Sequence, residues 1–281
     1  MLRFFRHIRK KLIEQNNIRK YLLYAIGEIM LVVIGILIAL QVNNWNEERK
    51  KQMEERHYME RLYLDVADDI VMLRQRQELW SRQMQLGLEA LAAKEVPTGD
   101  PERAWEIVRA FHHASNSVPL HLRDATYIDM VSSGQLGLIA DTDLRDFATL
   151  YYNSSWAVDL SSLVPEYRVA VRRIIPPDIH NYLSLMDCRV FEPPHRHILK
   201  DCTVPVTEVD LIALANTLIS DDGLRGELVY AMSVMNTATS IVEGVILVAA
   251  TKLHAQINKA LNGDGVPPET TPPKVDARVD N

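Results

Sequence analysis

The sequence lacks the short motifs that mark the common catalytic sites. It has no Gly-x-Ser-x-Gly nucleophile turn, no Ser-x-x-Lys pair, no His-Glu-x-x-His zinc motif and no glycine-rich loop that could cradle a phosphate. Nothing in it assembles a nucleophile, a base and a group that stabilises a transition state. We therefore expect a protein that is not an enzyme and that holds no cofactor.

Basic residues are scarce outside the N-terminus. The chain of 281 residues has a net charge of −6, yet residues 1–20 hold seven Lys and Arg and only one Glu. The remaining residues therefore carry a net charge of about −12 with His neutral. Since nucleic acid binding requires a basic surface, this acidity excludes nucleic acid as a partner.

Residues 21–40 are a continuous hydrophobic run in which Glu28 is the only charge. A helix rises about 1.5 Å per residue, so the run can cross a hydrocarbon core of about 30 Å. A cleaved signal peptide has a shorter apolar core and an Ala-x-Ala-like site, whereas this run ends in Ala39-Leu40-Gln41-Val42. The sequence predicts an uncleaved transmembrane helix over residues 21–42, with the lipid bilayer as a partner.

The charges that flank this run predict its orientation. Lys and Arg are retained on the cytoplasmic side of a membrane, and they are concentrated in residues 1–20. The N-terminus is therefore predicted to be cytoplasmic and the remainder exported, with Trp45 as an anchor at the outer interface. The basic cytoplasmic segment 1–20 is also amphipathic and suits the anionic inner leaflet; the alternative is that its cations only orient the span. Its apolar stripe consists of Leu2, Phe5, Ile8 and Leu12.

Two residues inside the predicted span favour contact with another helix in the membrane. An acidic side chain in a membrane is costly and often pairs with a polar group on a neighbour, and Glu28 has this position. Gly35 follows one heptad later on nearly the same face and permits a close approach of two helices. The alternative is that Glu28 reaches the headgroups and has no role.

Residues 43–262 are predicted to form an extracytoplasmic helical domain, so that the whole chain is all-α with an elongated bundle. From Glu47 to about Lys94 apolar residues recur at steps of three or four, which is typical of one long helix. A second long helix is expected from Asp221 to Leu261, antiparallel to the first. Its segment Ile241–Ala250 is too short for a second span and suits a buried helix. Residues 263–281, rich in proline, are predicted to be a disordered tail.

Short polar patterns predict helix ends and surfaces. Asp100-Pro101 is typical of the start of a helix, and Thr207 with Asp210 resembles a capping box. Acidic pairs such as Asp68-Asp69 are expected on solvated faces or at helix caps. The adjacent histidines His112-His113 are expected at the surface, since neighbours on a helix point about 100° apart.

Two blocks of the sequence resemble a known family. Tyr21 to Lys50 reads YLLYAIGEIMLVVIGILIALQVNNWNEERK, and a second block contains Thr126-Tyr127, Ser132-Ser133-Gly134-Gln135-Leu136 and Tyr151-Tyr152. Both blocks resemble the domain-of-unknown-function 6090 family of uncharacterised single-span bacterial membrane proteins. The resemblance implies a Gram-negative inner membrane and a periplasmic domain, and it brings no known catalytic residues.

The only two cysteines, Cys188 and Cys202, lie in one irregular segment. In an oxidising periplasm a disulfide between them would close about 15 residues and add roughly 3 kcal/mol to the stability. His195 and His197 lie between them, and two sulfurs with two imidazoles are also a ligand set that zinc accepts. Because the spacing matches no common zinc finger, the sequence favours the disulfide over a metal or two free thiols.

These patterns together favour a non-enzymatic, membrane-anchored periplasmic protein that scaffolds or regulates another envelope protein. Its partner would be another membrane or periplasmic protein, or a second copy of itself. The alternative is a ligand-sensing module, since helical bundles can bind small molecules in their cores. Such a sensor would signal through an associated protein, because residues 1–20 are too few for an output domain. A hydrolase with an irregular site is the least favoured hypothesis.

Overall fold

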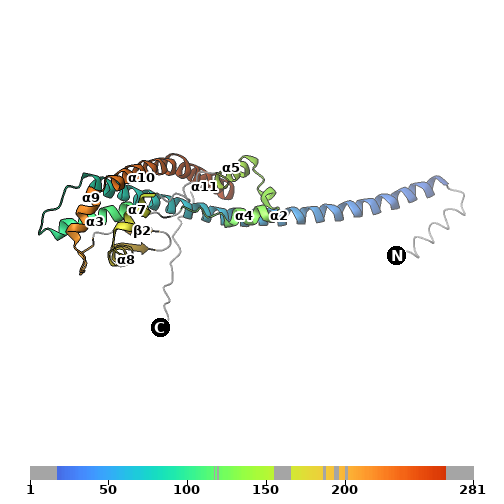
Figure 1. The fold of residues 1–281 in the computed structure, drawn as a ribbon. Helices are drawn as coiled ribbons and strands as arrows, with labels where there is room; N and C mark the ends of the chain where they lie inside the picture. The colour runs from blue at the N-terminus through green and yellow to red at the C-terminus, as the bar shows by residue number, and fades with distance from the viewer. Residues whose placement is uncertain are drawn as a thin grey trace, which may run out of the picture. The chain divides into compact units, whose positions relative to one another are not determined.

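A computed structural model describes residues 18–116, 118, 120–154, 166–185, 188–192, 196–199 and 202–263. The chain divides into two compact units, Met1–His57 and Tyr58–Asn281 (Figure 1). Apart from residues 18–20 and 263, the predicted basic segment and the predicted tail lie outside the described residues.

Helix α2 (Ile18–Ala92) contributes residues to both units. In the first unit its residues 29–54 are all exposed, in keeping with a run of Leu, Ile, Val and Ala that favours helix without a packed core around it. In the second unit one face of the helix is buried, through apolar residues at steps of three or four that include Leu62, Val66 and Leu73. The helix ends before Pro97, as the sequence predicts.

One core of the second unit forms where four shorter helices surround the end of α2. They are α3 (Pro101–Ala114), α7 (Glu166–Ile174), α8 (Pro177–Leu185) and α9 (Leu211–Ser220). Asp100 caps α3 by accepting a hydrogen bond from Arg103 N at 3.0 Å, and Pro101 occupies the first turn, which confirms the predicted start. Asp210 caps α9, whereas Thr207 lies before the helix and its hydroxyl donates to Asp178.

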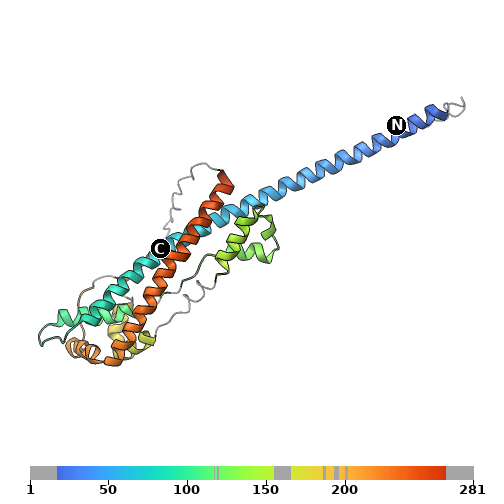
Figure 2. The same ribbon diagram turned by 90° about the horizontal axis from the view of Figure 1, so that it is seen from above.

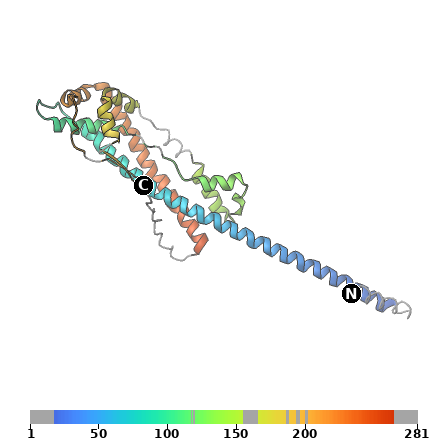
Figure 3. The same ribbon diagram turned by 90° about the horizontal axis from the view of Figure 1, so that it is seen from below.

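A second core of the same unit contains α4 (Ala125–Ser132), the 3-10 turn η1 (Leu136–Leu138) and α5 (Thr142–Tyr152). These elements pack against the earlier part of the second unit's α2 residues. Figure 3 shows α4 and α5 apart from α3, α7, α8 and α9. The second unit therefore has two apolar cores along the same segment of α2.

The second long helix belongs to both cores. It consists of α10 (Asp222–Ile241), the π-helical turn η2 (Val242–Ile246) and α11 (Leu247–Asn262). It runs back along α2 (Figure 2), so that α10 packs near the end of α2 while η2 and α11 pack near residue 59 onward. The approach is close at Gly87, where a Cβ atom would lie 2.8 Å from Met232 Sδ.

A short hairpin departs from the predicted all-α class. Strand β1 (Arg189–Glu192) pairs antiparallel with β2 (Arg196–Leu199), with Arg189 opposite Leu199. Elsewhere the described residues form helices and their connections, so the helical class of the fold is confirmed. The sequence gives little signal for strands of four residues, because four residues are too few for a clear alternation.

Candidate functional site

The first unit presents a helix with a long run of exposed apolar side chains. From Leu22 to Val42 the large apolar side chains are 44–74% exposed. The helix is long and apolar enough to cross a membrane, and an apolar surface of this extent is unfavourable in water. Glu28 is partly exposed on it, a Cβ atom on Gly35 would meet nothing within 4 Å, and Trp45 is 66% exposed.

In the second unit, a buried carboxyl group joins α2 to the segment of α4 and α5. Asp69 is 0% exposed and accepts hydrogen bonds from the Arg123 backbone N–H at 2.7 Å and from Tyr151 Oη at 2.9 Å. One turn earlier on α2, Asp65 accepts a hydrogen bond from Thr126 Oγ1. We call these five residues the Asp69 cluster.

The electrostatics of the Asp69 cluster stabilise the neutral form of its buried carboxyl group relative to an exposed one. Burial raises the pKa of Asp69 to about 7, because the surroundings cannot solvate the charged form, and the nearby Asp65 charge acts in the same direction. The hydrogen bonds from Arg123 and Tyr151 oppose this rise. Burial and the neighbouring Asp69 also raise the pKa of the Tyr151 hydroxyl above its ordinary value. The cluster can therefore bind or release one proton near neutral pH.

The tyrosines of the second motif pack beside this cluster. Tyr127 stacks on Tyr152 with ring centroids 4.8 Å apart, and Tyr151 meets Tyr152 edge to face at 4.9 Å. Gly134 adopts a φ of 70°, which suits glycine, just after α4 ends. The Ser133 hydroxyl donates to Asp129 O at 2.7 Å and helps to close the end of that helix. The Thr-Tyr, Ser-Gly and Tyr-Tyr motif thus builds and docks the α4–α5 segment.

The expectation of a solvated face for the pair Asp68-Asp69 is wrong for Asp69. Asp68 is partly exposed and lies 3.2 Å from Arg123 Nη1, but α4 and α5 cover Asp69. A signal was available in the sequence, because position 69 belongs to the same helical stripe as Leu62, Val66 and Leu73. A charged residue within an apolar stripe indicates a buried polar contact.

The histidines His112 and His113 are likewise buried, 0% and 1% exposed, which corrects their expected place at the surface. Helix α3 is enclosed by α7, α8, α9 and α2, so both of its faces are covered. His112 Nε2 lies 2.9 Å from His180 Nδ1 on α8, and burial lowers the pKa of His112. Gln83 Nε2 donates to His113 O at 3.2 Å. The contact between the His112 and His180 rings thus joins α3 to α8.

The structure joins Cys188 and Cys202 by a disulfide. Cys188 is fully buried, and Trp105 Nε1 donates a hydrogen bond to Cys202 O at 2.9 Å. The disulfide therefore closes the hairpin segment, and the hydrogen bond from Trp105 ties it to α3. Of the alternative zinc ligands, His195 lies outside the described residues, as does the side chain of His197. No group of three metal-ligating side chains occurs among the residues that the structure describes.

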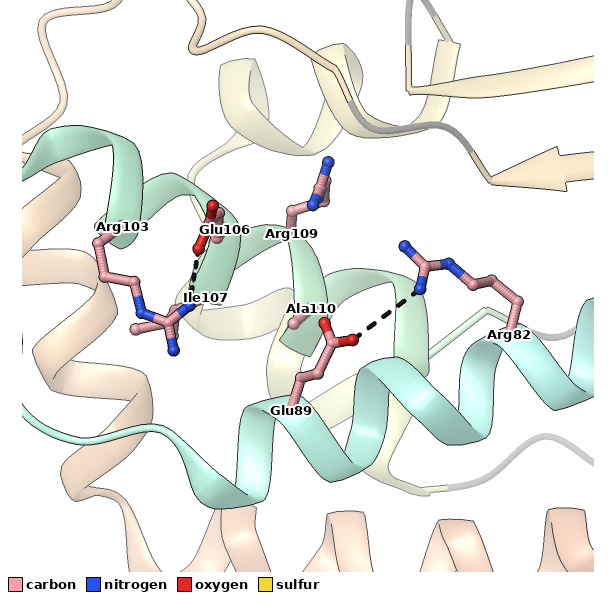
Figure 4. Close-up of a pocket in the computed structure, with 7 residues that line it drawn as sticks. All are labelled: Arg82, Glu89, Arg103, Glu106, Ile107, Arg109 and Ala110. Carbon is pink, nitrogen blue, oxygen red and sulfur yellow. Dashed lines mark hydrogen bonds and ion pairs between the residues drawn. The ribbon is translucent and has the colours of Figure 1, made fainter.

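A polar hollow of about 230 Å³ lies between α2 and α3 (Figure 4). Arg103 Nη1 lies 2.6 Å from Glu106 Oε2, and Arg82 Nη1 lies 3.9 Å from Glu89 Oε1. Arg109 adds a third guanidinium at the rim, while Ile107 and Ala110 supply apolar surface. The hollow is rich in both charges, and the sequence patterns did not reveal it because its residues come from two separate helices.

The comparisons with known proteins bear on the first half of the chain. Residues 28–158 match the model of a family described as Family of unknown function (DUF6090). The matched range contains the apolar helix from Glu28 onward, the whole Asp69 cluster and the tyrosine motif, and it ends before the disulfide. No curated protein and no solved structure matches the chain. The resemblance found in the sequence is thereby confirmed over residues 28–158, which are similar to the DUF6090 family of unknown function.

Proposed function

We propose that this protein is a non-enzymatic, membrane-anchored helical protein of the bacterial inner membrane that scaffolds or regulates another envelope protein. In this proposal α2 crosses the bilayer once with the N-terminus in the cytoplasm, and the second unit is periplasmic. The partner is another membrane or periplasmic protein, or a second copy of this chain. The carrying observation is the run of exposed large apolar side chains on the helix that bears Glu28 and Gly35.

The cost of Glu28 supports contact with another helix inside the membrane. An acidic residue at the centre of a span costs roughly 2.5 to 3.5 kcal/mol of insertion free energy, which a polar partner can offset. Gly35 lies one heptad further on nearly the same face, and apart from the helix's own nearby backbone no described atom lies within 4 Å of its Cβ position. A polar group beside a site of close approach is typical of a helix contact in a membrane.

The flanking residues support the orientation of the span. The seven Lys and Arg of residues 1–20 precede the apolar run, and such residues are retained in the cytoplasm. Trp45, 66% exposed just beyond the run, suits an outer interface, where indole rings anchor well. The disulfide between Cys188 and Cys202 suits an oxidising compartment such as the periplasm.

The test is partner recovery after cross-linking in cells and gentle solubilisation, with copurifying proteins identified by mass spectrometry. We expect a stoichiometric partner from the wild type and a loss of that partner with Glu28→Gln or Gly35→Leu. Gly27→Leu is the matched control, because Gly27 is equally open but lies about 100° around the helix from Glu28. Equal recovery from all four proteins contradicts the proposed helix contact, and recovery of nothing contradicts the scaffold itself.

A second candidate function is ligand sensing, and the hollow between α2 and α3 favours it. Three guanidinium groups and two carboxylates around apolar Ile107 and Ala110 could receive a small charged metabolite. Thermal-shift screening of the full chain against small carboxylates and amino acids tests this function. A saturable stabilisation that Arg109→Gln abolishes would favour sensing, and its absence at millimolar concentrations would leave the scaffold alone.

A further inference from the structure

The contact between α2 and the α4–α5 segment has a single fully buried carboxyl group at its centre among the described residues. Asp69 on α2 accepts from the Arg123 backbone N–H, which precedes α4, and from Tyr151 Oη on α5. One side chain therefore ties three parts of the second unit together. Because both hydrogen bonds are buried, the protonation of this group acts directly on the contact.

The ion pairs of this segment lie closer to solvent than Asp69 does. Arg123 Nη1 and Asp68 Oδ2 are 3.2 Å apart, with side chains 45% and 46% exposed. Arg61 Nη1 and Asp129 Oδ2 are 2.9 Å apart, with side chains 39% and 45% exposed. Exposed ion pairs contribute little to stability, since water and salt screen them. Asp69 is therefore the polar group whose state matters most to the contact.

We propose that Asp69 is a proton-operated latch: a protonated carboxyl group holds α4 and α5 closed on α2, and an ionised one lets them open more often. The physical reason is the desolvation of charge. A neutral carboxylic acid is tolerated in the core, whereas a carboxylate gains from any opening that admits water. This inference does not depend on the function proposed above, since it concerns the second unit alone.

The groups that act on Asp69 come from each element around it. From α2, Asp65 disfavours a second negative charge; from the segment before α4, Arg123 favours it, and from α5 the Tyr151 hydroxyl favours it. Tyr152 on α5 is half-buried, and burial with the nearby Asp69 raises the pKa of its hydroxyl. Helices η2 and α11 contribute apolar residues to the same core, including Val242 and Ile246. Desolvation is the largest of these effects and places the pKa of Asp69 at about 7.

The direction of the pH dependence follows from proton linkage. In an opened segment Asp69 returns towards its ordinary pKa of 3.8, so the closed state binds more protons between these two values. The stabilisation is complete below the lower pKa and is lost as the pH rises through the upper one. Between pH 5.5 and 8.5 the ratio of closed to open segment should fall roughly 30-fold.

The test is hydrogen exchange of the full chain in lipid nanodiscs, followed in peptides from α4 and α5 at pH 5.5 and 8.5. Each variant is compared with the wild type at the same pH, so that the intrinsic pH dependence of exchange cancels. Asp69→Asn mimics the protonated state, and we expect wild type and variant to differ about 30-fold more at pH 8.5 than at pH 5.5. A wild type to Asp69→Asn ratio that is the same at both values overturns the latch.

Two further variants keep the test decisive. Asp68→Asn is the matched control on the adjacent exposed position, and it should retain the pH dependence of the wild type; loss of that dependence would assign the effect to the wrong carboxyl group. Tyr151→Phe removes a donor that favours the charged form, so it should shift the midpoint of opening to higher pH. An unchanged midpoint would overturn the proposal even if Asp69→Asn failed to fold.

Discussion

Among the described residues, two helices are long and apolar enough to cross a membrane, and they differ in how far their apolar residues are buried. In the first, within the N-terminal part of α2, the apolar side chains from Leu22 to Val42 are all exposed. In the second, Asp222–Asn262, one face is buried in the two cores through Val242, Ile246 and Leu253. Composition alone does not separate an anchor from a core helix. The separation comes from whether the apolar residues cover the whole circumference or one face.

The exposed face of the second helix sharpens this contrast. Several of its hydroxyl groups donate to backbone oxygens four residues earlier, as Thr237 does to Ser233 O at 3.1 Å and Thr251 to Leu247 O at 2.7 Å. Such bonds satisfy the hydroxyl groups locally, although the residues themselves stay on the exposed face. Glu243 remains exposed on the π-helical turn. A helix of this kind passes a hydropathy test although a core accounts for its apolar residues.

The largest expected effect is on membrane association. Replacing Ile34 and Leu37 by Arg should each raise the free energy of insertion by roughly 2.5 to 3.5 kcal/mol, enough together to move the protein out of the membrane fraction. Arg at Val245 and Val248, on the exposed face of the second helix, should leave that fraction unchanged. Alkaline extraction of membranes and immunoblotting measure both pairs. If Arg at Val245 and Val248 released the protein from the membrane fraction, the second helix would also cross the membrane.

The next effect concerns the stability of the second unit. Leu253 is 0% exposed, so Leu253→Ala should lower the free energy of unfolding by about 2 to 5 kcal/mol through lost burial and a cavity. Val248→Ala, at a position 58% exposed in the same helix, should change it by less than about 0.5 kcal/mol. Denaturant unfolding of the solubilised protein followed by circular dichroism measures both. Equal effects would contradict a one-sided core helix.

The disulfide Cys188–Cys202 lies in the sequence between the two long helices. Its removal should have an effect of intermediate size. Replacing Cys188 and Cys202 together by Ser should cost about 3 kcal/mol of stability, because the unfolded chain regains the freedom of a closed loop. The disulfide also indicates on which side of the membrane the segment lies, since its formation in growing cells requires that the segment be exported. Thiol labelling of cell extracts under denaturing conditions measures it. Two reactive thiols in the wild type would place this segment in the cytoplasm.

Sequence reasoning succeeded where a pattern is local and failed where the third dimension decides. The apolar run and the cap at Asp100 depend on neighbours in the chain, and both were predictable. His112, His113 and Asp69 are polar residues that segments distant in sequence cover. Covering is a tertiary effect, and it contradicts the usual preference of such residues for the surface.

The same limit applies to the candidate site. The tyrosine motif could be recognised in the sequence, yet nothing in its spacing says that Tyr151 meets a carboxyl group on α2 more than eighty residues earlier. The one sequence signal was Asp69 itself, which occupies a core position of the apolar stripe. The Thr207 cap failed for a different reason, because Asp210 beside the helix start accepts from Ile212 N and Ala213 N.

The smallest effect that we expect is a dependence of the stability of the second unit on pH. The folded protein holds the pKa of Asp69 at about 7, above its value of 3.8 in an exposed chain, so the native state binds the extra proton between these values. The resulting stabilisation is complete below the lower pKa and disappears as the pH rises through the upper one. From pH 5 to pH 8 the wild type should therefore lose roughly 2.6 kcal/mol of unfolding free energy that Asp69→Asn does not lose. Denaturant unfolding at several pH values measures this difference. Ile34→Arg should leave it intact, because Ile34 is 53% exposed and belongs to the first unit. A parallel pH dependence of wild type and Asp69→Asn would assign the effect to other groups.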